Sequence, residues 1–271
     1  MGRSLAILGV PGVLDGGGAA DTSFSMTVTT TGAQQLKLDG LTVSASTTVD
    51  WGDNSSNDYT GSGSRTHNYA GAGTWTVTIK QPLNVTLIDL RDTKITSVTG
   101  ANLSKMVNLT SLTLNGIGTA LVWTVNDTAP MPSGITYLYL HTLANLTWDV
   151  GSVAGANMPA NATSVTIVST GTVTIAADDV LPAPMTTFRF ENGLNAAAVD
   201  AVLAALYLAF PTRTGTAGTI DLLGTGNAAP TGVSPGSAEC PPTTGWNTAY
   251  ELVNDSCNVS PKHWASVSLQ T

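Results

Sequence analysis

The sequence is poor in charged and aromatic residues, and each shortage narrows what the chain can do. Only 10% of its 271 residues are Asp, Glu, Lys or Arg, and only 6% are Phe, Trp or Tyr. The Lys and Arg residues are scattered singly and the net charge is −8, so there is no basic patch to bind a nucleic acid. No stretch approaches the roughly 20 apolar residues that a membrane-spanning helix requires.

Residues and motifs typical of enzymes are equally scarce. Histidine and glutamate occur three times each, and the chain has no GxSxG elbow, P-loop or HExxH motif. Asp50, Asp53 and Asp58 allow a calcium site, but we favour ordinary turn carboxylates. We therefore predict a non-enzymatic protein with no cofactor and no metal.

The sequence contains two cysteines, Cys240 and Cys257. They allow either a disulfide, which would stabilise the chain by roughly 3 kcal/mol, or two free thiols. No histidines stand at metal-ligand spacing beside them, so a zinc site is not predicted.

The sequence does have a repeated six-residue unit that is apolar at positions one, four and six. Successive units from residue 85 begin 24, 26, 27, 23 and 32 residues apart, a period that is typical of a solenoid with one short strand per turn. Positions four and six share one side of a strand, so stacked turns would bury them in a continuous core. The units are Val85–Leu90, Leu109–Leu114, Ile135–Leu140, Ala162–Ile167, Met185–Phe190 and Ala217–Leu222, with a seventh candidate at Trp264–Leu269.

These units resemble the leucine-rich repeat family, although the Asn or Cys that the family places three residues after the last Leu is missing. The resemblance implies a degenerate parallel β-solenoid over residues 82–271. A β-sandwich whose strands happen to share this spacing is the alternative.

The segment 23–81 alternates apolar and polar residues and contains VDWGD at Val49–Asp53 and HNYAGAGTWTVTI at His67–Ile79. This order is similar to the PKD domain, an immunoglobulin-like β-sandwich, and the resemblance implies the same fold here. The predicted fold class is therefore mainly β, an N-terminal β-sandwich followed by the leucine-rich-repeat-like solenoid with one or two short helices.

Two helices are predicted near the C-terminus. Helical spacing of apolar residues indicates a helix over Asn195–Phe210, and a second is expected at Trp246–Asn254. From about residue 224, the order IDLLGTGNAAPTG, helix, final strand resembles the closing cap of leucine-rich-repeat proteins common in phages and prophages.

The repeat register predicts which residues face outward on the sheet. Positions three and five of each unit, and the residue after it, should form columns on the open face. On this face we predict an aromatic and charged patch for a protein or glycan partner; a merely solvated or packed sheet is the alternative. The patch residues are Tyr137, Tyr139, His141, Arg189 and Glu191.

Residues 1–22 form a predicted N-terminal arm with a glycine hinge. Its apolar residues are Leu5, Ile7, Leu8, Val10, Val13 and Leu14. We expect the arm to dock on a neighbouring copy or another virion protein, whereas folding back on its own chain is the alternative.

The arm and the resemblances to PKD and phage-type leucine-rich-repeat domains together lead us to predict a virion structural protein of a tailed phage. It would be a decoration, head-fibre or tail-associated protein. A secreted bacterial surface adhesin or an extracellular filament subunit is the alternative.

Overall fold

The computed structural model describes residues 22–151, 157–179, 181–214, 218–224, 226–232, 234, 236–257 and 264–270. The apolar residues of the predicted arm lie outside these ranges. The strands are β1 (Phe24–Thr31), β2 (Gln34–Asp50), β3 (Ser56–Tyr69), β4 (Ala72–Ile79), β5 (Val85–Leu90), β6 (Ile95–Thr99), β7 (Ser111–Thr124), β8 (Tyr137–Asp149), β9 (Ser164–Thr174), β10 (Thr187–Glu191), β11 (Thr219–Asp221) and β12 (Ser266–Ser268). The described helices are α1 (Gly100–Leu103), α2 (Ala196–Ala209) and α3 (Gly245–Asn254), with short 3-10 turns at Pro82–Asn84 and Phe210–Thr212.

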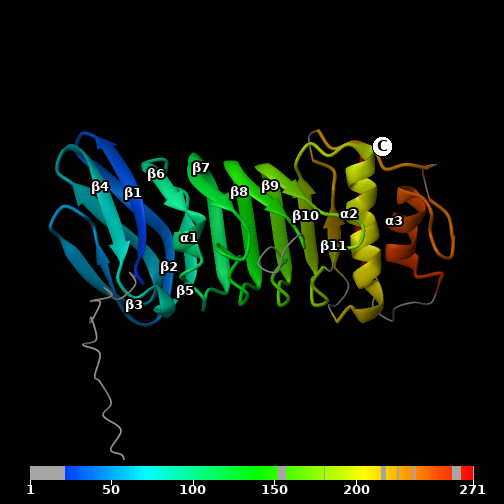
Figure 1. Cartoon of the computed structure of the whole chain (residues 1–271), viewed down its shortest axis with the longest axis horizontal. Helices are drawn as coiled ribbons and strands as arrows, with labels where there is room; N and C mark the ends of the chain where they lie inside the picture. The colour runs from blue at the N-terminus through cyan, green and yellow to red at the C-terminus, as the bar shows by residue number, and fades with distance from the viewer. Residues whose placement is uncertain are drawn as a thin grey trace, which may run out of the picture.

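The chain is mainly β, and from β5 onward its strands stack in parallel like the turns of a solenoid. Figure 1 shows them side by side along the long axis, in the order β5, β7, β8, β9, β10 and β11, and β12 pairs with β11 at the end of the sheet. Each strand pairs with the next so that equivalent positions of the six-residue units face one another; Leu112, for example, pairs with Leu138, which pairs with Val165. The predicted stacked parallel strands are therefore confirmed. The fourth-position column, buried from Ile88 to Ile220, comprises Ile88, Leu112, Leu138, Val165, Phe188, Ile220 and Val267.

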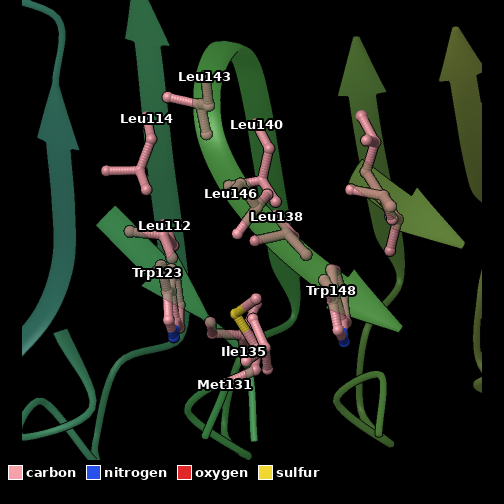
Figure 2. Close-up of a cluster of buried hydrophobic side chains, with 14 of the residues drawn as sticks. Leu112, Leu114, Trp123, Met131, Ile135, Leu138, Leu140, Leu143, Leu146 and Trp148 are labelled. Carbon is pink, nitrogen blue, oxygen red and sulfur yellow. The ribbon is translucent and has the colours of Figure 1, made fainter. Parts of the chain in front are cut away.

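The middle turns carry a second parallel ladder that the sequence did not predict. In β8 the chain bends near Thr142, whose φ is +55°, and Figure 2 shows it doubling back so that Leu138 and Leu146 face one core. Beyond the bend, Thr147–Asp149 pairs in parallel with Thr172–Thr174 of β9. The buried indole of Trp123 comes from the second half of β7, and that of Trp148 from the second half of β8. Each middle turn thus closes its core from two sides.

A row of threonines connects successive turns at the start of each strand. The hydroxyls of Thr110, Thr136, Thr163 and Thr186 each donate to the carbonyl of the equivalent threonine one turn earlier, at 2.9–3.1 Å. The backbone N–H of each donates to the same carbonyl at 2.7–2.8 Å. These paired bonds fix the register before the sheet begins, each hydroxyl contributing about 1 kcal/mol.

The N-terminal strands are joined to the parallel region by strand pairing. β2 pairs antiparallel with β5, β1 pairs antiparallel with β6, and β6 pairs in parallel with β7. The ladders therefore close into a ring, β7–β5–β2–β4–β1–β6, with β3 attached to β2. One hydrophobic cluster runs through this ring and the parallel region. The predicted two-sheet sandwich is not confirmed by this closed pairing and stays a prediction.

The two longer helices lie where the sequence predicted them, at the C-terminal end (Figure 1). Asn195 caps α2 by accepting from the N–H of Ala198, and Thr244 caps α3 by accepting from the N–H of Asn247. Nearby, the buried Arg213 guanidinium lies 4.0 Å from the ring centre of Trp264, at the entry to β12. Burial lowers the pKa of Arg213. This contact joins the segment after the Phe210–Thr212 turn to the start of β12.

Candidate binding face on the parallel sheet

The parallel register arranges the outward side chains of the sheet in a grid. Tyr139 stands opposite Thr166, and Thr166 stands opposite Arg189, so these three residues form one row across β8, β9 and β10. His141, Val168 and Glu191 form the next row across the same strands. The structure thus places the five predicted patch residues on strands β8 and β10 of one face, separated by β9.

An aromatic strip runs along β8 and consists of Tyr137, Tyr139 and His141. They occupy alternate positions, so they project from the same side of the strand. Tyr137 is 42% exposed, and the rings of Tyr139 and His141 lie nearly parallel with their centres 6.0 Å apart. The His141 Nδ1 lies 2.7 Å from the hydroxyl of Thr142, which holds the imidazole beside the bend.

Short hydroxyl side chains flank the strip on both sides. Tyr137 stands opposite Ser111 of β7 and Ser164 of β9, and Tyr139 stands opposite Thr113 and Thr166. Serine and threonine are much shorter than tyrosine; Tyr137 is exposed, whereas Tyr139 is half-buried and Thr113 beside it is buried.

Two groups of arginine and carboxylate side chains border the face. On β5 and just beyond it, Arg91 makes a two-pronged contact with Asp89, both bonds being 2.7 Å. On β10, the Nε of Arg189 lies 2.5 Å from Glu191 and 3.6 Å from Asp221 of β11. The guanidiniums are about half-exposed while Asp89 and Glu191 are mostly covered, so the carboxylates hold the cationic groups in fixed positions. The hydrogen bond that Arg189 donates to Glu191 raises the pKa of Arg189, which keeps it cationic.

Sequence reasoning placed Asp89, Arg91 and Asp221 in the outward columns but left them out of the patch. The signal was present, because Asp89, Arg189 and Asp221 occupy position five of their units. Arg189 and Asp221 stand opposite each other on the adjacent strands β10 and β11, so these two charges are expected to meet, whereas Asp89 is separated from Arg189 by β7, β8 and β9 and pairs with Arg91. The pairing itself depends on side-chain conformations that the sequence does not show.

The structure joins Cys240 and Cys257 in a disulfide, with the sulfurs 2.12 Å apart and the Cα atoms 5.5 Å apart. The carboxylate of Glu251 is within 4.8 Å of both sulfurs. Glu251 is fully buried and accepts from the hydroxyl of Ser256 and from the N–H of Cys257. With the sulfurs bonded to each other, this group ties the end of α3 to the preceding loop.

The three aspartates considered for calcium each have a separate partner. Asp50 pairs with Lys80 at 3.1 Å, and Asp58 accepts from the hydroxyl of Thr48 at 2.6 Å. Asp53 contacts the Nε2 of His67 at 2.7 Å. The turn-carboxylate interpretation stays a prediction.

The Asp53–His67 pair belongs to an aromatic cluster of the N-terminal region. The imidazole of His67 stacks on Trp51, with ring centres 4.9 Å apart, and Tyr69 donates from its hydroxyl to the Trp51 carbonyl. Burial acts to raise the pKa of Asp53, but hydrogen bonds from Ser55 and His67 outweigh it and hold that pKa below its usual value. The cluster therefore stabilises the fold most when Asp53 is ionised.

Neither the models of known protein families, nor curated protein sequences, nor solved structures give a match to this chain. Among the helices of the described ranges, none has both the length and the apolar character needed to cross a membrane.

Proposed function

We propose that the chain is a non-enzymatic structural protein of a tailed-phage virion, a decoration, head-fibre or tail-associated component. In this proposal the N-terminal arm attaches it to another virion protein or to a second copy, and the parallel sheet is presented outward. The resemblances to PKD-like and phage-type leucine-rich-repeat domains support this assignment.

The observation that carries the proposal is the unbroken strand pairing from the N-terminal ring to β12. The N-terminal ring and the parallel region share one hydrophobic core, so they are not separate domains joined by a hinge. The chain is therefore expected to behave as a stiff spacer. A stiff spacer anchored at one end holds its side faces at a fixed distance from the anchor. Such an arrangement suits a surface appendage.

The second candidate, a secreted bacterial surface adhesin or extracellular filament subunit, fits the disulfide as well as the first does. Disulfides persist on cell and virion surfaces and are rare in the cytosol. The Cys240–Cys257 bond is therefore compatible with both candidates and favours an extracellular location for either.

Mass spectrometry of particles purified from the phage that encodes the chain tests the proposal. We expect the protein at a fixed ratio to the major structural proteins, and a variant lacking residues 1–14 that folds but is absent from the particle. Recovery from the medium or cell wall of uninfected bacteria, and not from particles, would contradict the proposal and favour the adhesin. Normal incorporation of the truncated variant would show that the arm is not the anchor.

A further inference from the structure

We propose that the aromatic strip of Tyr137, Tyr139 and His141 binds a surface polysaccharide built of uncharged pyranose sugars. This inference deepens the proposed function, since it names the partner of the outward face. The inference rests on the proposed function only for the location of the polysaccharide, on a bacterial surface; the binding itself does not require that function.

The first argument is the shape of the strip. Three rings at alternate positions of one strand span roughly 13 Å, since a strand rises about 3.3 Å per residue. The carbon-bound hydrogens on the face of a pyranose ring pack against aromatic rings, and a row of rings can hold successive sugars of one chain. Exposed tyrosines suit this task because they offer a large rigid surface at little cost in conformational entropy.

The second argument is the chemistry beside the strip. The hydroxyls of Ser111, Ser164 and Thr166 on β7 and β9 lie beside the rings and are only half-buried, so they can donate hydrogen bonds to sugar hydroxyls and accept from them. Further out, Arg91 and Arg189 offer N–H groups held in place by Asp89 and Glu191. Fixed polar groups around an apolar platform are the usual composition of a small-molecule site.

The third argument is charge. Arg91 is balanced by Asp89, and Arg189 contacts two carboxylates, Glu191 and Asp221. With its cations already paired, the face does not attract an anionic polymer such as a nucleic acid, and it holds few unpaired charges for a strongly charged protein. A neutral polyhydroxylated chain matches this balance.

The fourth argument disfavours a protein partner. The apolar core of a protein interface is contiguous. On this face, the exposed large apolar side chains are Tyr137 on β8 and Leu223 just beyond β11, with β9 and β10 between them. The strip therefore lacks the continuous apolar patch that a protein partner would bury.

The test uses the full chain on an array of purified bacterial capsular, O-antigen and cell-wall polysaccharides. Half of the spots are first oxidised with periodate, which cleaves sugar rings that carry adjacent free hydroxyls. We expect binding to a subset of untreated spots and its loss after oxidation. Tyr139→Ala should weaken the apparent affinity at least about tenfold, the usual effect of losing a central aromatic contact.

Two matched variants separate stacking from folding. Tyr139→Phe keeps the ring and should bind within about threefold of the wild type. Val122→Ala alters an exposed residue of the second ladder and should change nothing. Equal melting temperatures of all variants would show that the fold is intact.

The proposal is overturned if no untreated spot binds, if binding survives periodate, or if Tyr139→Ala binds like the wild type. A contact to protein in the same preparations, revealed by loss of binding after protease treatment, would also overturn it. Incorporation of Tyr139→Ala into particles is measured in parallel. Absence of even the wild type from particles is a failure of the proposed function, not of the glycan site.

Discussion

Leu138 lies at the middle of the buried fourth-position column, so its truncation tests the parallel core directly. Its side chain is completely buried, it pairs with Leu112 and Val165 on the adjacent strands, and Leu146 faces it from the second half of β8 (Figure 2). Leu138→Ala removes three carbon atoms, which costs about 2.4 kcal/mol of transfer free energy. The residual cavity, enclosed by strands on both sides, should bring the total loss of unfolding free energy to about 3–4 kcal/mol.

Urea unfolding followed by tryptophan fluorescence measures this loss, because Trp123 and Trp148 are buried in the same core. Leu223→Ala is the matched control: the same change of side chain at a position that is 49% exposed, where we expect a loss below about 1 kcal/mol. Leu138→Asp should prevent folding altogether, since it buries an unpaired charge. A Leu138→Ala protein within 1 kcal/mol of the wild type, or one no less stable than Leu223→Ala, would refute the stacked core.

Three further predictions address other parts of the molecule. Thr136→Val keeps the side-chain shape but removes the hydroxyl bond to Thr110, and chemical denaturation should show a loss of about 1 kcal/mol. Cys257→Ser removes the disulfide and should lower the stability of the C-terminal region around α3 by roughly 3 kcal/mol, which faster hydrogen exchange in α3 would reveal. Alkylation of both cysteines in the native protein, detected by mass spectrometry, would instead show that the bond is absent. Because the pKa of Asp53 is lowered in the fold, its contribution is present above the unfolded value of about 3.9 and is lost as the pH falls below it. Asp53→Asn should therefore flatten the acid limb of a plot of melting temperature against pH, and an unchanged limb would contradict the role of the pair with His67.

The register of the parallel strands could be predicted because it depends on one local pattern. Apolar residues at positions four and six must face the core, and stacking then aligns equivalent residues of neighbouring turns. The threonine at position two of five consecutive units was readable in the same way, and its hydroxyl bonds follow from the stack. Helix α2 could be predicted for the same reason, because its capping residue, its apolar spacing and its alanines all lie within sixteen consecutive residues.

The second ladder could not be predicted, because its cause is a bend that resembles a strand end. In the sequence, Gly116 and Gly118 indicate a loop that closes the strand. In the structure both have positive φ. In the structure they turn the chain within β7 and let it continue to Trp123 on the opposite side of the core. The ring closure through β1 and β6 depends on residues about 70 positions apart, and no local pattern encodes such a contact.

The ends of the stack distinguish between the proposed functions. A repeat stack exposes its core at both ends unless something covers it, and an uncovered end invites another copy to add on. Here β2 pairs with β5 and β1 with β6, so antiparallel strands cover the first turn. At the other end β12 is only three residues long, and the core residues Trp264 and Leu269 on either side of it are buried near α3. The antiparallel strands over the first turn, together with the shortness of β12, disfavour growth of a filament by stacking turn on turn, and so disfavour the filament-subunit alternative. In the functions proposed above, partners would therefore bind the sides of the stack, one of which carries the aromatic strip.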